Sequence, residues 1–204
     1  MRSFFLLSLL AACGSTPTPV APVEAPVEVA APVAAPTPAG TELAVDNTRS
    51  GISWTAHKLL GENAIALRDY TGKVWVDGDQ VTGVAFVGKM ASLEADQPKL
   101  TTHLLNADFF NVEVYPESSF TSTSVAAGSK VDGFNATVTG DLTVMGITKT
   151  ITFPAAIELT ADQVAARAAF DVDRRDFKLV YPGMPDNLIK DIVPMEVHFV
   201  ALRK

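Results

Sequence analysis

The side chains that could do chemistry in this sequence are few and scattered. His103, Asp108 and a nearby serine could in principle form a nucleophilic triad, in which the histidine takes the serine proton and the aspartate orients the histidine. However, no G-x-S-x-G turn surrounds any serine, and the sequence has no glycine-rich phosphate loop. Three histidines and one cysteine, far apart along the chain, do not form a zinc-site pattern. The sequence therefore predicts a protein that is not an enzyme and that holds no metal and no other cofactor.

The single cysteine, Cys13, follows a short apolar run and two alanines. The run begins after Arg2 and is too short for the roughly 20 residues that a membrane-spanning helix needs, so the layout is typical of a secretory signal peptide. Leu10-Ala11-Ala12-Cys13 resembles the lipobox of bacterial lipoproteins, in which the cysteine is lipidated and becomes the first residue of the mature chain. We therefore expect a signal peptide at residues 1–12 and lipidation at Cys13. The alternative is an ordinary signal peptide with an incidental cysteine.

Residues 13–40 are rich in proline and alanine. Proline lacks a backbone donor and fixes φ, so neither a helix interior nor a sheet can form through this segment, and we expect a disordered tether. Recognition by a proline-binding partner is a second reading. By the usual sorting pattern of lipoproteins, Gly14 rather than aspartate after the cysteine implies the outer membrane. The expected location is the cell envelope, with the protein lipid-anchored through Cys13 on the periplasmic face of the outer membrane.

The charge balance excludes one class of partner. Lys and Arg number 16 against 23 Asp and Glu, which gives a net charge of −7, and no basic block is present. Such a chain repels the phosphate backbone of nucleic acids, so no nucleic-acid partner is expected.

Residues 41–204 show the period-two alternation of apolar and polar side chains that is typical of β-strands. Eight such strands, joined mostly by short turns, predict an all-β fold, an eight-stranded antiparallel β-barrel that is closed because closure removes exposed edges. One predicted strand covers residues 64–77, with Gly72 as a bulge. Leucines at helical spacing in residues 98–110 predict a short helical insertion near one end, with Asp96 as its N-cap. A loop is expected at residues 177–187, before the last strand.

The inward positions of these strands mix aromatic side chains with alanines. A barrel of eight strands can either be filled by its own side chains or hold one ligand. Small residues opposite large ones could pack tightly and fill the interior, whereas several alanines in neighbouring strands would leave a long groove, so the residues alone leave both interiors open. The residues predicted to line the cavity are Trp54, Leu67, Phe86, Met90, Phe120, Leu142, Phe153, Phe170 and Met195.

Four segments in order resemble the YceI-like family of lipid- and polyisoprenoid-binding proteins, over residues 43–204. They are the stretch from Lys99 to Phe110 with its "HL…DFF" pattern, the Tyr115-Pro116 strand start, the hairpin from Val138 to Lys149, and Phe170-Asp171-Val172-Asp173-Arg174. The hairpin departs from the family pattern because Asp141 replaces an asparagine. The resemblance implies a lipocalin-like barrel whose hydrophobic interior holds an isoprenoid chain, such as that of a quinone or a polyprenyl phosphate.

These inferences give one leading hypothesis, a cell-envelope lipoprotein that binds an isoprenoid lipid for sequestration or transport. Its partners would be that lipid and the membrane, and the sequence leaves a homodimer open. His103 is the candidate contact to the ligand head group, although it could instead brace the insertion against the barrel. Arg174 and Arg175, between two aspartates, are expected in a surface ion-pair cluster, with an anion site as the alternative. A structural or interaction protein with a filled barrel is the competing function.

Overall fold

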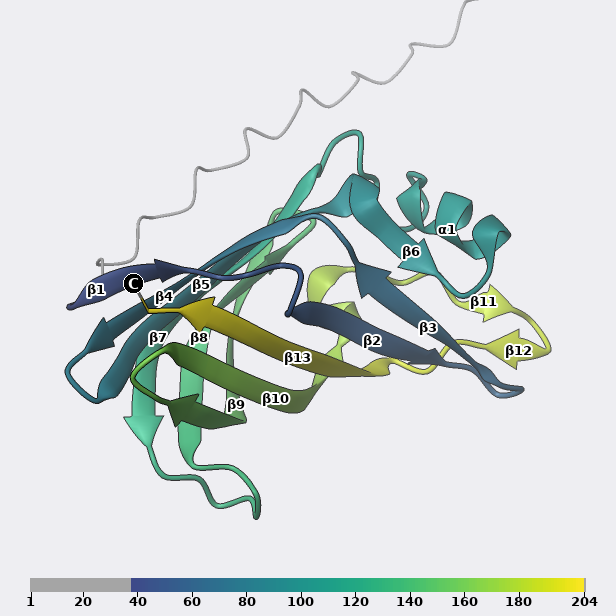
Figure 1. Ribbon diagram of the computed structural model, residues 1–204. Coiled ribbons are helices and arrows are strands. Elements are labelled where there is room, and N and C mark those ends of the chain that lie inside the picture. Colours follow the sequence, from purple (N-terminus) through teal and green to yellow (C-terminus); the bar gives the residue numbers. More distant parts are fainter. Residues whose placement is uncertain (1–37, 204) are drawn as a thin grey trace, which may run out of the picture. The chain divides into compact units, whose positions relative to one another are not determined.

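The computed structural model describes residues 38–203, so the predicted signal peptide, Cys13 and most of the predicted tether lie outside the described residues. In the described part, eleven antiparallel strands form one sheet that curls strongly into a half-barrel, with a short helix beside it (Figure 1). The order across the sheet is β1 (Thr41–Ala44), β4 (Tyr70–Asp77), β5 (Gln80–Lys89), β7 (Glu117–Ala127), β8 (Ala136–Val144), β9 (Ile147–Leu159), β10 (Gln163–Asp173), β13 (Ile192–Leu202), β2 (Gly51–His57), β3 (Glu62–Leu67) and β6 (Leu93–Ala95). The predicted all-β antiparallel fold is confirmed.

The predicted closed barrel of eight strands is wrong. The sheet has two edges, since its outermost strands β1 and β6 are not neighbours. The strand number differs because two expected strands break. The strand expected at residues 64–77 bends at Arg68 and Asp69, which separate β3 from β4. Its neighbour bends at the same level, where a 3-10 turn, η1 (Met90–Ser92), separates β5 from β6. Hydrogen bonds join the two bends, since the Arg68 amide donates to the Ser92 carbonyl at 3.2 Å and the Asp69 amide donates to the Ser92 hydroxyl at 2.8 Å. Together with the short β1, these breaks give eleven strands.

Gly72 does not form the predicted bulge. It pairs with Phe86 in regular register, and the irregularity in this ladder lies between Trp75 and Val76. A Cβ atom at Gly72 would lie 2.6 Å from the Phe86 ring and 2.7 Å from Val45. The glycine is therefore needed for close approach, since it leaves room for an aromatic ring on the inner face.

The sheet splits between β9 and β10. These strands pair only from Ala155 with Ala168 to Leu159 with Val164. The next pair would join Pro154 to Ala169. Ala155 points its carbonyl to the β8 side, where it accepts from the Asn135 amide at 3.1 Å. Because successive residues of a strand point their amides to opposite sides, the Pro154 nitrogen faces β10, and it has no hydrogen to donate. Beyond this point, β9 stays paired with β8 and β10 with β13.

The helix α1 (Pro98–Leu105) is shorter than predicted, and residues 106–115 follow it as turns. Its N-cap is Gln97 and not Asp96. The Asp96 carboxylate is occupied elsewhere, since it accepts from the Asn63 side chain at 2.8 Å. Leu104, only 1% exposed, fixes α1 against the apolar side chains of β3 and β6. No helix in residues 38–203 is long and apolar enough to cross a membrane.

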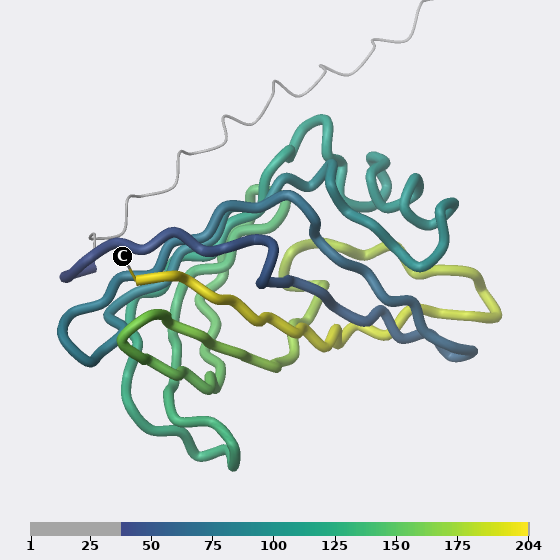
Figure 2. The backbone as a smooth tube through the Cα atoms, viewed as in Figure 1, coloured from purple at the N-terminus to yellow at the C-terminus, as the bar shows by residue number. Residues whose placement is uncertain are grey.

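The segment after β10 is partly ordered into short elements where a loop was predicted. It contains a 3-10 turn, η2 (Arg174–Phe177), and a small hairpin made of β11 (Gly183–Met184) and β12 (Asn187–Leu188). Figure 2 shows this segment beside the helix insertion, at the end of the sheet opposite β1. The His103 and Tyr181 rings, 4.8 Å apart, connect the two segments.

Candidate functional site

The inner face of the half-barrel encloses an apolar cavity. Its volume is about 190 Å³, and it is partly open to solvent. Strands β2, β3, β5, β7, β8, β9, β10 and β13 contribute to its walls, and so do the segments after α1 and after β10. All nine side chains that the alternation pattern placed inward lie around it: Trp54, Leu67, Phe86, Met90, Phe120, Leu142, Phe153, Phe170 and Met195. Their role in binding a ligand stays a prediction.

The lining side chains in the segments after α1 and after β10 were not predicted from the sequence. Phe109 and Phe110 follow α1, whereas Phe177, Leu179 and Ile189 follow β10. Period-two alternation does not reach these segments, so the pattern that found the other residues could not find them. The one local sequence feature that pointed to these segments was the pair Phe109-Phe110 in the "DFF" pattern. These segments close part of the cavity that the half-barrel alone leaves open.

Aromatic rings cover much of the wall. Phe153 and Phe170 stack with centroids 4.2 Å apart, and Phe120 adds a tilted contact to Phe153 at 5.5 Å. Phe153 lies on β9 and Phe170 on β10, so the stacked pair crosses the split in the sheet. On the other side, Trp54 meets Phe110 edge to face at 6.3 Å. The stacked rings of Phe153 and Phe170 therefore form the cavity wall where β9 and β10 are not hydrogen-bonded.

The only charged side chain of the lining is Arg174, which is 6% exposed. The predicted surface cluster is wrong for this residue. Its guanidinium has five N–H groups, and all five donate within the protein. The acceptors are the carbonyls of Leu179, Tyr181, Ile189 (3.3 Å) and Lys190 (3.2 Å) and the carboxylate of Asp191 (2.9 Å). These bonds occupy every donor of the guanidinium, so Arg174 holds residues 179–191 in place.

Arg175 lies at the surface, and its Nε lies 2.9 Å from Asp191. Asp191 therefore takes one bond from each of the two arginines. The neighbouring aspartate, Asp173, instead accepts from the Arg175 backbone amide at 2.9 Å and caps η2.

His103 is not among the residues that line the cavity. Its Nε2 lies 2.8 Å from the Asp108 carboxylate, and its ring contacts Phe109 at 5.9 Å and Tyr181 at 4.8 Å, edge to face in both cases. These contacts connect α1, the turn after it and the segment after β10. They account for His103 as a brace of the insertion, whereas its contact with a ligand head group stays a prediction.

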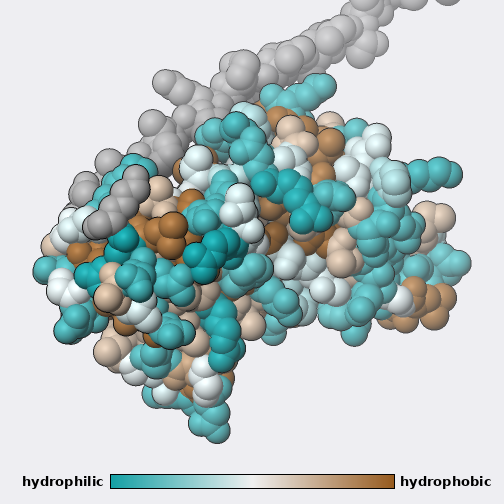
Figure 3. All heavy atoms as spheres, viewed as in Figure 1, coloured by the Kyte–Doolittle hydropathy of each residue, from teal (hydrophilic) through white to brown (hydrophobic). Residues whose placement is uncertain are grey.

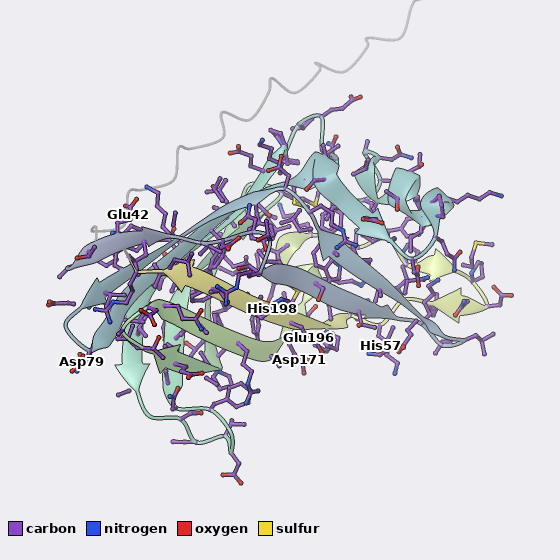
Figure 4. The ribbon with its side chains drawn as sticks, viewed as in Figure 1. Glu42, His57, Asp79, Asp171, Glu196 and His198 are labelled. Carbon is purple, nitrogen blue, oxygen red and sulfur yellow. The ribbon has the colours of Figure 1, made fainter. Side chains whose placement is uncertain are left out.

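The cavity wall offers no group for acid–base or nucleophilic chemistry besides two hydroxyls. Ser118 and Ser119 reach it from β7, and none of the lining residues is His, Asp, Glu, Lys or Cys. Asp171 on β10 and Glu196 and His198 on β13 alternate with lining residues and lie on the other face of the sheet (Figure 4). Within residues 38–203, no group of three or more His, Cys, Asp or Glu is placed to hold a metal ion.

Tyr70, which is 3% exposed, has a hydroxyl with no hydrogen-bond partner among the described residues. Burial raises the pKa of this phenol above its usual 10.0. The unfolded chain therefore loses this proton first as the pH rises past its ordinary pKa, and the free energy of unfolding falls there. We expect Tyr70→Phe to raise the free energy of unfolding by about 1 kcal/mol at neutral pH, since it removes an unpaired buried hydroxyl.

Urea unfolding at neutral pH and above pH 10 measures both effects of Tyr70→Phe, and the alkaline loss of stability should be smaller in the variant. Tyr115→Phe, at a less buried tyrosine, is the control. A variant that is less stable than the parent at neutral pH would show that the hydroxyl has a partner.

This chain is similar in sequence to known proteins. A family model described as a YceI-like domain matches residues 43–201. Protein YceI of Escherichia coli is 38% identical over 84 residues, which are 40% of this chain and 42% of that protein. A UPF0312 protein of Photorhabdus laumondii is 46% identical over 63 residues, 31% of each chain. The matched segments thus span less than half the length of these relatives.

Two solved structures have the same fold at low sequence identity. BcnA of Burkholderia cenocepacia superposes with a TM-score of 0.67 at 21% identity, covering 77% of this chain and 99% of that one. A polyisoprenoid binding domain from Saccharophagus degradans gives a TM-score of 0.63 at 13% identity, covering 79% of this chain and 98% of that one.

Proposed function

Since this chain belongs to the YceI-like domain family, we propose that its half-barrel binds the hydrocarbon tail of an isoprenoid lipid in the apolar cavity. The observation that carries the proposal is the wall itself. Apart from two serines, the side chains of the wall are apolar. The one charged group, Arg174, donates its N–H groups to acceptors within the protein. Such a cavity would discriminate between lipids by the length and width of their hydrocarbon tails, whereas the head group would remain at the mouth.

The energetics support a tail of several isoprene units. Burial contributes roughly 0.8 kcal/mol for each CH2 equivalent. Immobilising a ligand costs of order 4–15 kcal/mol. Three or four isoprene units buried in the cavity would offset that cost without any contact to a head group. The Saccharophagus degradans domain, which shares the fold, is described as polyisoprenoid binding, and this favours the same ligand class here.

The protein would act as a binding protein in the cell envelope. The lipobox-like Leu10-Ala11-Ala12-Cys13 supports anchoring through a lipidated Cys13, and the residues between Cys13 and β1 would give the half-barrel reach from the outer membrane. Sequestration and transport of the lipid both fit a cavity that is partly open. A filled interior, the competing reading, agrees less well with this empty space.

Tryptophan fluorescence tests the proposal directly, because Trp54 lines the cavity and the chain has only one other tryptophan. Trp75→Phe leaves Trp54 as the single reporter. We expect the diterpenoid alcohol geranylgeraniol to shift its emission and to saturate at one ligand for each chain. Glycerol, which has no tail, is the control ligand.

Mass spectrometry of the organic extract of protein made in its own cell envelope should also yield an isoprenoid lipid. An unchanged emission together with an extract free of apolar ligand would contradict the proposed function.

A further inference from the structure

Two hairpins expose apolar side chains at one end of the sheet. Leu59 and Leu60, in the turn between β2 and β3, are 61% and 75% exposed. Met184 and Leu188, in the β11–β12 hairpin, are 63% and 44% exposed. Figure 3 shows hydrophobic surface at its right-hand end, where Figure 1 places both hairpins. We call these four side chains the apolar tip.

Hydrogen bonds join the two hairpins near their ends. The Leu59 amide donates to the Leu188 carbonyl at 3.1 Å, and the Leu60 amide donates to Asn187 Oδ1 at 2.9 Å. One step further in, the Lys190 amide donates to the His57 carbonyl at 2.8 Å. Because these bonds hold the hairpins side by side, the apolar tip is a single surface and not two independent loops.

Basic residues lie directly behind the apolar tip. Lys58 precedes Leu59, and Lys190 lies two residues after Leu188. Neither lysine makes an ion pair within residues 38–203. Of the nearby carboxylates, Glu62 lies 3.2 Å from His57, and Asp186 lies in the turn of the β11–β12 hairpin. Apolar side chains backed by unpaired lysines are complementary to a bilayer interface, where tails lie beneath anionic head groups.

The apolar tip is continuous with the cavity. Ile189 follows Leu188 in the chain, pairs with Lys58 in an isolated bridge, and lines the cavity. Arg174 donates to the Ile189 carbonyl at 3.3 Å, so the same buried guanidinium supports the cavity wall and the base of the tip hairpin. A surface that touched the tip would therefore lie next to the cavity wall.

We propose that the apolar tip docks onto a lipid bilayer that contains anionic phospholipid. Its role in passing an isoprenoid tail between bilayer and cavity rests on the proposed function, but docking itself does not. The chain permits this orientation, because the segment between Cys13 and Pro38 can extend to roughly 80 Å. The path from the β1 end of the sheet to the apolar tip follows β4 and β3, residues 62–77, which measure at most about 53 Å.

Vesicle flotation tests the docking. The full-length chain carrying Cys13→Ser, which cannot be lipidated, is mixed with vesicles of phosphatidylcholine and phosphatidylglycerol. We expect Leu59→Ser/Leu60→Ser and Met184→Ser/Leu188→Ser each to lower the partition coefficient by about tenfold or more, because each removes two apolar side chains from the interface. Val131→Ser/Leu202→Ser is the matched control, since these side chains are 49% and 47% exposed and lie in other parts of the fold. It should bind like the parent.

Three further measurements separate docking from the other readings. Far-UV circular dichroism and the thermal midpoint of the tip variants should match the parent, since all four side chains are exposed. Their affinity for geranylgeraniol in solution should also be unchanged, so that a failure of ligand binding is distinguishable from a failure of docking. Equal vesicle binding by parent and both tip variants would overturn the proposal. So would a parent dimer that the tip variants convert to monomer with no change in vesicle binding, because the occupant would then be a second copy.

Discussion

Replacing Arg174 with alanine is expected to lower the free energy of unfolding by about 3–5 kcal/mol, which is the range for removal of one member of a buried ionic network. The variant leaves four carbonyls and the Asp191 carboxylate without the donors that they share in the parent. Leu179 and Ile189 line the cavity on the segment that these bonds hold. Geranylgeraniol should therefore bind more weakly at temperatures where the variant is still folded. Urea unfolding followed by circular dichroism measures the loss of stability.

Arg175→Ala provides the matched control, because the neighbouring arginine shares the same carboxylate at the surface. The side chain of Arg175 is 65% exposed, whereas that of Arg174 is 7% exposed. An exposed pair contributes about 0–1 kcal/mol, so Arg175→Ala should be close to the parent in stability. Equal losses in the two variants would contradict the role assigned to Arg174. Arg174→Lys should recover little, since an ammonium group has three donors and cannot reproduce the planar fork.

The second large effect is expected from Ala56→Trp, which fills the cavity. Ala56 contributes one methyl group to the wall on β2, so an indole at this position would occupy space that the proposed ligand needs. Displacing one isoprene unit removes roughly 4 kcal/mol of burial at about 0.8 kcal/mol for each CH2 equivalent. The affinity for geranylgeraniol should then fall by about 100-fold or more. Isothermal titration in detergent-free buffer measures the Kd.

Thr55→Trp places the same side chain one residue earlier, on the outer face of the same strand. Thr55 does not line the cavity, so this variant should keep the affinity of the parent. Comparable losses of affinity in both variants would show that the indole weakens binding by destabilising the fold. Unchanged affinity in Ala56→Trp would show that the ligand binds elsewhere. The thermal midpoints of the two variants measure whether the indole destabilises the fold.

The inner face could be predicted from the sequence because strand alternation is a local property. A residue such as Phe153 points inward when its neighbours Thr152 and Pro154 point outward, whatever the strand pairs with. The breaks at Asp69 and at Ser92 could not be predicted in the same way. The Asp69 amide in one bend donates to the Ser92 hydroxyl in the other, 23 residues away. Neither segment alone therefore contains a sequence pattern that predicts its bend.

Arg174 shows the same limit for a single side chain. Its sequence neighbours include Asp173 and Asp176, and this local charge pattern pointed to a surface cluster. The actual acceptors are mainly backbone carbonyls, which every residue carries and which no sequence pattern marks. Burial of the guanidinium follows from how the chain returns from Leu179 to Asp191, and that path is a tertiary property.

The missing donor at Pro154 has a consequence for the range of ligands. Where two strands are paired along their length, as β10 and β13 are, spreading them would break backbone hydrogen bonds. The first half of β9 and the second half of β10 are not paired, and the stacked rings of Phe153 and Phe170 are among the side chains that would have to separate there. The cavity can therefore widen between β9 and β10 without breaking backbone hydrogen bonds there, so we expect it to accommodate hydrocarbon tails of different width.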